Sequence, residues 1–242
     1  MRLDRALVDR GLAPTRARAR DAVMRGAVRI DGVVATKPGR EVGPEATLAL
    51  DDPAARYVSR AALKLLAGLE AFGIDPAGLR ALDVGASTGG FTQVLLERGA
   101  AHVTAIDVGH GQLDASLADD PRLRSIEGLN ARDLSAGHLD DAPDLVVADV
   151  SFISLRLALP PALDLAAPGA RAVLLVKPQF EVGREGIGKG GIVAPERARE
   201  TAETLRGWLD GLPRWRALGL VPSPIVGGDG NAEWLLGGAK EG

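Results

Sequence analysis

Residues 83–92 read Asp83-Val84-Gly85-Ala86-Ser87-Thr88-Gly89-Gly90-Phe91-Thr92. The apolar run from Leu79 to Val84 that leads into them predicts a buried strand, and residues 91–98 that follow have helical spacing and stop at Gly99. A strand, a glycine turn and a helix N-terminus form a cradle whose backbone amides face a nucleotide-type cofactor. The alternative is a glycine turn in an ordinary α/β unit. We expect a cofactor site held by Asp83, Gly85, Ser87, Thr88 and Gly89.

Two acidic residues indicate which cofactor suits this cradle. The glycine spacing is not the G-x-G-x-x-G of dinucleotide binders, and Asp83 stands two residues before the first glycine. A carboxylate there suits an ammonium group and repels a pyrophosphate, which disfavours a nicotinamide dehydrogenase. Asp107 ends the next expected strand, residues 103–107, where a ribose hydroxyl is usually held. The pattern resembles the first motif of S-adenosylmethionine-dependent methyltransferases.

The composition is that of an ordinary globular protein, with 46% hydrophobic and 25% charged residues among 242. The absence of cysteine excludes disulfides and thiolate metal sites, and the three histidines have no ligand spacing, so we expect no metal. The N-terminus has no secretory signal, and no run approaches 18 apolar residues. We therefore expect a cytoplasmic protein with no membrane partner.

The N-terminal region has a charge opposite to that of the remainder. Residues 1–40 hold ten basic and four acidic side chains, a net charge of +6, which leaves −9 for the remainder of a chain of net charge −3. Thr15 is expected to cap a basic helix over residues 16–25, and an Asp31-Gly32 turn predicts a hairpin after it. Such asymmetry suggests a polyanion partner, although a basic helix can be a solvated face. The candidate RNA-binding residues are Arg2, Arg16, Arg18, Arg20 and Arg25.

Strands and helices alternate through the rest of the chain, and the expected strands are almost wholly apolar. This pattern predicts an α/β fold with a mostly parallel, doubly wound sheet. Together with the motif resemblance, it implies a Rossmann-like methyltransferase domain. The expected division is a small α+β RNA-binding domain over 1–48, a linker over 49–58 and a methyltransferase domain over 59–242. Ligands of such sheets bind outside the carboxyl ends of the strands, where Asp83, Asp107, Asp149 and Lys177 are expected.

Charged groups that end buried strands are costly unless they are paired or used. Asp149 and Lys177 are therefore expected to form a pair, and Lys64 can approach them from an expected helix, capped by Ser59, that ends at Phe72. A plain exposed lysine is the alternative for Lys64. Only five of the 29 basic residues are lysines, and lysine, unlike arginine, can lose its proton when desolvated. Glu233 joins this edge if the last strand is antiparallel.

Several segments together make the chain resemble a known family from end to end. They are residues 57–65, 85–92, 130–132, 148–155 and 176–183, and Gly26-Ala27-Val28-Arg29-Ile30-Asp31-Gly32 adds the signature of a small αL-type RNA-binding domain. The chain is similar to the TlyA (hemolysin A-like) rRNA methyltransferases, whose catalytic domain is FtsJ-like.

The resemblance implies transfer of a methyl group from S-adenosylmethionine to a ribose 2′-hydroxyl of an rRNA cytidine. It also implies a catalytic tetrad, Lys64, Asp149, Lys177 and Glu233, with Lys177 as base and Asp149 orienting it. Asn130 and Asp149 join the expected cofactor residues.

Two alternatives to this function remain at this point. The chain can be an RNA-binding protein whose methyltransferase domain is inactive or acts on another RNA. The family name also suggests a pore-forming cytolysin, but the sequence has no signal peptide and no membrane-length segment. Because family members that act on the small subunit have longer ends, the expected partner is large-subunit rRNA or its ribosomal subunit. The sequence does not indicate the oligomeric state.

Overall fold

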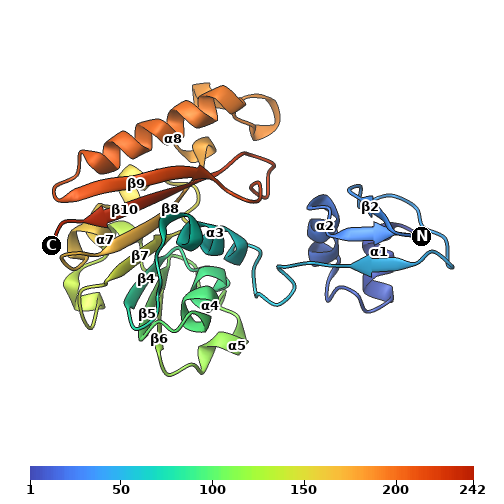
Figure 1. Ribbon diagram of the computed structural model, residues 1–242, viewed down its shortest axis with the longest axis horizontal. Coiled ribbons are helices and arrows are strands. Elements are labelled where there is room, and N and C mark those ends of the chain that lie inside the picture. The colour runs from blue at the N-terminus through green and yellow to red at the C-terminus, as the bar shows by residue number, and fades with distance from the viewer. The chain divides into compact units, whose positions relative to one another are not determined.

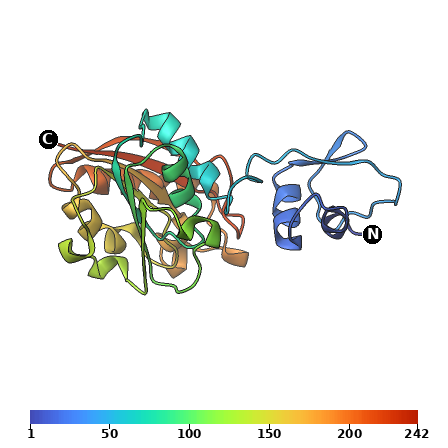
Figure 2. The ribbon, with the colours of Figure 1, turned by 90° about the horizontal axis from the view of Figure 1, so that it is seen from below.

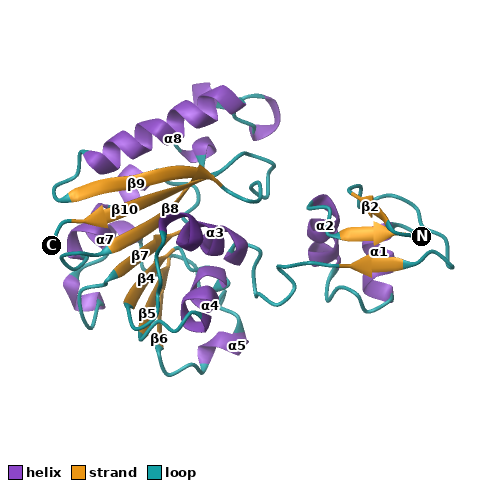
Figure 3. Ribbon diagram, in the orientation of Figure 1, coloured by secondary structure: helices purple, strands orange, loops and turns teal.

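The computed structural model describes residues 1–242 apart from the side chain of Arg184, and the chain divides into two compact units, Met1–Arg56 and Tyr57–Gly242. In the first unit, two helices accompany a three-stranded antiparallel sheet of order β2-β1-β3 (Figure 3). Thr15 Oγ1 accepts a hydrogen bond from Arg18 N at 3.2 Å and caps the second helix, as predicted. The elements are α1 (Leu3–Asp9), α2 (Arg16–Met24), β1 (Val28–Ile30), β2 (Val33–Ala35) and β3 (Leu48–Leu50).

The predicted hairpin joins β1 to β2. Its two turn residues, Asp31 and Gly32, have φ angles of 49° and 81°, the left-handed values that a tight two-residue turn between twisted strands requires. Residues 49–56, which the sequence assigns to a linker, contribute the rest of β3 and Asp52 to this unit. Its core forms where the inner faces of the helices meet β1.

The second unit is built on a seven-stranded sheet of order β6-β5-β4-β7-β8-β10-β9 (Figure 1). The pairs among β4 to β8 are parallel, and β10 runs antiparallel to both of its neighbours, so the predicted mostly parallel, Rossmann-like sheet is confirmed. The strands are β4 (Arg80–Val84), β5 (His102–Asp107), β6 (Leu123–Glu127), β7 (Leu145–Ala148), β8 (Arg171–Val176), β9 (Trp215–Pro222) and β10 (Trp234–Lys240).

Helices cover both faces of this sheet (Figure 2), which explains why all four residues of β7 are apolar and buried. One core lies between the sheet and α3 and α4, and the other between the sheet and α6, α7 and α8. The helices are α3 (Ala62–Phe72), α4 (Gly90–Glu97), α5 (Ala115–Ala118), α6 (Leu155–Ala158), α7 (Pro160–Leu165) and α8 (Pro195–Asp210), with 3₁₀ turns η1 (Ala131–Asp133), η2 (Ala136–His138), η3 (Pro178–Phe180), η4 (Arg184–Gly186) and η5 (Lys189–Gly191). Within the described residues, no helix is both long and apolar enough to cross a membrane.

The start of α3 differs from the prediction. The helix begins at Ala62, and Ser59 Oγ accepts a hydrogen bond from Ala61 N at 3.2 Å in the turn before it, so Ser59 is not the helix cap. Further along, Gly68 faces the sheet so closely that a Cβ there would lie 2.5 Å from Val173 Cγ1. This close approach brings Lys64, one turn earlier on α3, over the edge of the sheet.

Candidate active site

The sheet gathers charged residues at one edge. Asp107 is the last residue of β5, Asp149 follows β7 directly, and Lys177 follows β8 directly. Glu233 precedes β10, and because β10 is antiparallel, its first residue, Trp234, pairs with Val176 at the carboxyl end of β8. The antiparallel last strand that the position of Glu233 required is therefore present.

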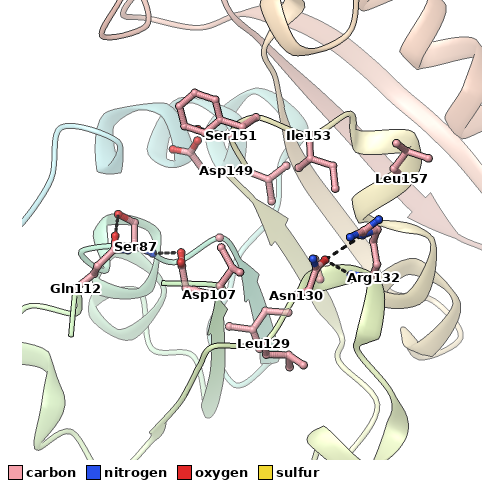
Figure 4. A pocket seen from close by; sticks show the side chains of 16 residues that line it. Ser87, Asp107, Gln112, Leu129, Asn130, Arg132, Asp149, Ser151, Ile153 and Leu157 are labelled. Carbon is pink, nitrogen blue, oxygen red and sulfur yellow. Dashed lines mark hydrogen bonds between the residues drawn. The ribbon is translucent and has the colours of Figure 1, made fainter. Parts of the chain in front are cut away.

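A cavity of about 690 Å³ opens beside this edge (Figure 4). It is lined by polar groups from the ends of β4, β5 and β7 and by apolar side chains from the loops between them. A smaller cavity of about 160 Å³ adjoins it and extends the lining to Lys177 and to the turn before α3. Gly85, Ser87, Asp149 and Ser151 line both cavities.

The glycine turn fits a ligand that approaches the backbone closely. Gly85 has a φ of 84°, and a Cβ there would lie 2.8 Å from the carbonyl oxygen of Asp149, so no side chain fits without displacement. Gly89, also at positive φ, is the N-cap residue of α4, and a Cβ there would lie 2.5 Å from Leu117 Cδ1. Thr88 lies between them, exposed, in the lining of the smaller cavity.

Asp83 is completely buried beneath this turn. Its Oδ2 accepts a hydrogen bond from Thr92 Oγ1 at 2.7 Å, whereas its Oδ1 has no partner among the described residues. Burial, with a smaller effect from the carboxylates of Asp149 and Asp107, raises the pKa of Asp83 to about 7 against the opposing effect of Thr92. A buried acid with a free oxygen beside a cavity fits a cationic group of a ligand.

Asp107 and Asn130 hold two loops that line the larger cavity. Asp107 Oδ2 accepts a hydrogen bond from Ser87 N at 2.8 Å and its Oδ1 accepts one from Gly109 N at 2.7 Å. Asn130 caps η1 through a 3.1 Å hydrogen bond from Arg132 N. Both side chains line the cavity, so lone pairs of Asp107 and the amide of Asn130 can also meet a ligand (Figure 4).

Two lysine–carboxylate pairs stand side by side at the carboxyl ends of β7 and β8. Lys64 Nζ donates to Glu233 Oε2 at 2.5 Å, and both side chains are buried, so Lys64 is not a plain exposed lysine. Burial raises the pKa of Glu233 even though Lys64 opposes the rise. Lys177 Nζ lies 2.5 Å from Asp149 Oδ1 as an ion pair, and its aligned hydrogen bond goes to another oxygen, Ser151 Oγ, at 2.7 Å.

The two pairs differ in access. Lys64 and Glu233 are closed off, whereas Lys177 and Asp149 are half-buried and line the cavities. The first pair can supply a fixed electrostatic field, and the second can exchange a proton with a bound molecule. No group of three or more acidic or histidine side chains that could hold a metal ion is found among the described residues.

Three of the five candidate RNA-binding arginines form ion pairs within the first unit. Asp4 is 1% exposed and accepts hydrogen bonds from Arg2 and Arg16, which bring its pKa down to about 2. Arg25 pairs with Asp52 through two hydrogen bonds of 2.7 and 2.9 Å and is largely buried. These three guanidinium groups are committed within the unit.

The other two candidate arginines lie elsewhere on α2. Arg18 is half-buried and donates to the carbonyl of Ala55 at 3.4 Å. Arg20 is exposed, and no side-chain partner of it is found in the part of the chain that the structure describes. Arg20 is therefore the candidate with the most freedom to meet a polyanion.

Sequence reasoning missed several residues of the site. Ser151 and Glu181 lie in segments that carry the family resemblance, so their position in those segments was the available signal. Gln112, whose Oε1 accepts a hydrogen bond from Ser87 Oγ at 3.0 Å, gave no signal because it follows the strand end by five residues in an irregular loop. The apolar lining residues Ile106 and Leu129 look like ordinary core residues in the sequence.

A doubly wound sheet with a ligand cavity at its carboxyl edge and a lysine–carboxylate cluster beside it defines a methyltransferase-type site. Comparison with known proteins agrees: residues 57–240 match the FtsJ-like methyltransferase family and residues 1–48 match the S4 domain. The chain belongs to the FtsJ-like methyltransferase family, among the TlyA-like proteins that carry an S4 domain.

Individual relatives extend along nearly the whole chain. The 16S/23S rRNA (cytidine-2′-O)-methyltransferase TlyA of Mycobacterium tuberculosis is 48% identical over 97% of this chain and 88% of its own. Hemolysin A of Brachyspira hyodysenteriae is 37% identical over 97% of this chain and 98% of its own. A solved structure of a Streptococcus thermophilus protein named as a hemolysin superposes with a TM-score of 0.76 at 40% identity, covering 100% of this chain and 88% of that one.

Proposed function

We propose that this protein transfers a methyl group from S-adenosylmethionine to the ribose 2′-hydroxyl of a cytidine in rRNA, and that it works in the cytoplasm. The observation that carries the proposal is the pair of lysine–carboxylate contacts, Lys64–Glu233 and Lys177–Asp149, at the sheet edge beside the cavity. The name of the Mycobacterium tuberculosis relative, an rRNA (cytidine-2′-O)-methyltransferase, supports the choice of substrate.

Most of the proposed cofactor-binding residues line the two cavities, whereas Asp83 and Gly89 are buried at the glycine turn, outside both linings. The free oxygen of Asp83 suits the ammonium of the methionyl part, and Asp107 suits the ribose hydroxyls. Gly85, Ser87, Thr88 and Gly89 supply the close backbone turn, while Asn130 and Asp149 complete the walls. When bound, S-adenosylmethionine supplies an electrophilic methyl group.

The chemistry left to the chain is to make a ribose hydroxyl nucleophilic. Lys177 in its neutral amine form accepts the hydroxyl proton at Nζ, and Asp149 orients that amine and balances the ammonium that results. Lys64, held by Glu233, places a buried amine next to this pair and fixes the electrostatic surroundings of the reacting hydroxyl. Most of the remaining rate enhancement comes from holding the two reactants in line.

The first unit is proposed to hold the RNA. Its net charge is positive. Arg16, Arg18 and Arg20 lie on α2, Arg25 follows that helix and Arg2 precedes α1. The guanidinium groups of Arg2, Arg16 and Arg25 also maintain the fold. Phosphate contacts of this kind position the RNA without reading its sequence. The substrate partner is then rRNA or a ribosomal subunit, with the large subunit expected first.

The test is to incubate the protein with methyl-labelled S-adenosylmethionine and separated, unmodified ribosomal subunits, and to locate the label. We expect label at one cytidine of the large-subunit rRNA, with small-subunit rRNA as the second acceptor to be examined. Cofactor binding without transfer to either RNA would support the alternative, an RNA-binding protein whose methyltransferase domain is inactive.

A further inference from the structure

The segment after β7 and the segment after β8 are joined at three points. At the first, Lys177 Nζ donates to Ser151 Oγ at 2.7 Å, two residues beyond its ion-pair partner Asp149. At the second, the rings of Phe152 and Phe180 meet with their centroids 5.0 Å apart. The chain order is the same in both segments, so the two lie alongside one another beyond the end of the sheet.

Glu181 forms the third contact between the two segments. Its carboxylate accepts a hydrogen bond from Ser154 Oγ at 2.6 Å and another from Leu155 N at 2.8 Å. Helix α6 does not require this help, because Ser154 Oγ already accepts a hydrogen bond from Arg156 N at 3.2 Å as its cap. Burial raises the pKa of Glu181, so the carboxylate is kept there in an unfavourable environment.

The segment that Glu181 ties down is strained. Phe152 has a φ of 64°, a left-handed conformation that is unfavourable for a bulky residue and persists only where the surroundings enforce it. Ser151 stands immediately before this strained residue and is exposed to solvent. Without a tie, we expect the segment to relax and Ser151 Oγ to leave the position in which it meets Lys177.

We infer that Ser151 is the second acceptor that aims the amine of Lys177, and that Glu181 is the positioning residue that holds Ser151 in place. An amine fixed by one carboxylate can pivot around it, whereas acceptors on both sides, Asp149 and Ser151, define one direction. The inference rests on the proposed role of Lys177 as base, but the contacts can be tested without RNA.

Competitive labelling of amines tests the contacts directly. The chain has only five lysines, so an amine-reactive reagent at low dose gives a separate labelling rate for each by mass spectrometry, with exposed Lys37 as internal standard. We expect Ser151→Ala and Glu181→Gln each to raise the labelling of Lys177 relative to Lys37 at least threefold. In both variants the amine of Lys177 loses the hydrogen bond to Ser151 Oγ and becomes more accessible to the reagent. The exposed-site controls Ser125→Ala and Glu200→Gln should leave this ratio unchanged. A Lys177 ratio within 1.5-fold of wild type in both test variants would overturn the inference.

Single-turnover methyl transfer provides the functional test. We expect Ser151→Ala to slow transfer about tenfold at saturating cofactor and RNA, Ser151→Thr to restore the rate to within threefold of wild type, and neither to change cofactor affinity more than twofold. If Glu181 acts through Ser151, the double variant Ser151→Ala/Glu181→Gln should be no more than twofold slower than Ser151→Ala. Multiplied effects, or no rescue by threonine, would contradict the inference.

The outcomes separate this inference from the proposed function. If the wild-type protein transfers methyl groups to rRNA but the labelling and rate tests show no effect of Ser151, only the inference fails. If wild type transfers no methyl group to any rRNA while Lys177 labelling rises in both variants, the contacts stand and the proposed function fails.

Discussion

Folding shifts the pKa values of carboxylates in opposite directions in the first unit and at the sheet edge of the second unit. In the first unit the hydrogen bond from Arg2 leads in bringing the pKa of Asp4 down to about 2, and Arg25 lowers the pKa of Asp52 despite burial. At the sheet edge of the second unit, burial raises the pKa of Asp83 to about 7 and also raises the pKa of Glu233, which Lys64 only partly offsets.

The opposite directions have opposite consequences for stability. A carboxylate whose pKa falls on folding stabilises the protein above its unfolded pKa near 4, and the contribution is lost as the pH falls through the folded value. A carboxylate whose pKa rises on folding destabilises the protein as the pH climbs from about 4 through the folded value. Asp4 and Asp52 therefore support the fold of the first unit, whereas Asp83 and Glu233 at the sheet edge of the second unit are retained against stability, as expected of a functional site.

The largest effect that separates the two kinds of charge is expected at Lys177. Lys177→Arg keeps the positive charge, but arginine cannot give up its proton at any workable pH. We expect single-turnover methyl transfer to fall by about 10²–10⁴, the usual value of general-base catalysis, with cofactor and RNA affinities near wild type. Lys64→Arg is the matched control and should be milder, because a fixed charge is all that its role requires. A Lys177→Arg rate within a few-fold of wild type across a pH series would rule out the base role.

Gly85 tests the cofactor turn. Gly85→Val places a branched side chain at positive φ against the carbonyl of Asp149, and we expect cofactor affinity measured by calorimetry to fall about 100-fold. Gly78→Val is the control, since Gly78 also has a positive φ but no atom within 4 Å of its Cβ position. Equal affinities in the two variants would argue against close backbone approach at Gly85.

A variant of Asp83 tests whether a carboxylate with a raised pKa destabilises the second unit. With a pKa of about 7, its ionisation should weaken the fold as the pH rises from 5 to 7.5, and Asp83→Asn should abolish that loss. We expect the free energy of unfolding of Asp83→Asn relative to wild type to rise by about 3 kcal/mol over this range. Tryptophan fluorescence in urea reports on the second unit alone, because Trp208, Trp215 and Trp234 all lie in it.

The control for this measurement is Asp119→Asn, at an exposed acid beside α5, which should show no such pH dependence. The same pH dependence in Asp83→Asn as in wild type would mean that Asp83 is ionised at no cost.

A variant of Arg25 tests whether the ion pair with Asp52 stabilises the first unit. Arg25→Ala leaves Asp52 largely buried without its two hydrogen bonds, and we expect the first unit to lose about 2 kcal/mol of stability. Hydrogen exchange of the β1 amides measures this loss, since the first unit contains no tryptophan or tyrosine. Exposed Arg29→Ala serves as control. Unchanged protection would remove the structural role assigned to Arg25.

The smallest expected effect is at Arg20. Arg20→Glu should weaken binding to rRNA and reduce the slope of log affinity against log salt by about 1, because one phosphate contact is lost. Arg171→Glu, at the start of β8 and away from its carboxyl end, should leave the slope unchanged. A wild-type slope in Arg20→Glu would show that this face of α2 does not hold RNA.

The sequence predicts the type of sheet better than it predicts where helices begin or which side chains pair. The mostly parallel, doubly wound sheet could be predicted, because apolar runs such as residues 145–148 reveal strands covered on both faces. Helix starts were harder: Ser59 resembles a cap in the sequence but only stabilises the turn before Ala62. Local sequence does not fix a boundary that tertiary packing sets.

The candidate site divides in the same way. Strand-end positions pointed to Asp149 and Lys177, since parallel strands bring their carboxyl ends to one edge. The ion-pair partners of Arg25 and Arg16 could not be predicted from the sequence, because Asp52 lies 27 residues from Arg25 and Asp4 lies 12 residues from Arg16. Nor could the exposure of Ser151 beside Lys177, which depends on the strained turn at Phe152.

The most direct test of the central claim is the chemical position of the transferred methyl group. A lysine that removes a hydroxyl proton serves attack by oxygen, so nucleoside analysis of rRNA labelled by the wild-type protein should return 2′-O-methylcytidine, and the label should fall by at least 100-fold with Lys177→Arg. Label on a base nitrogen or carbon, or 2′-O-methylcytidine formed equally well by Lys177→Arg, would contradict the account.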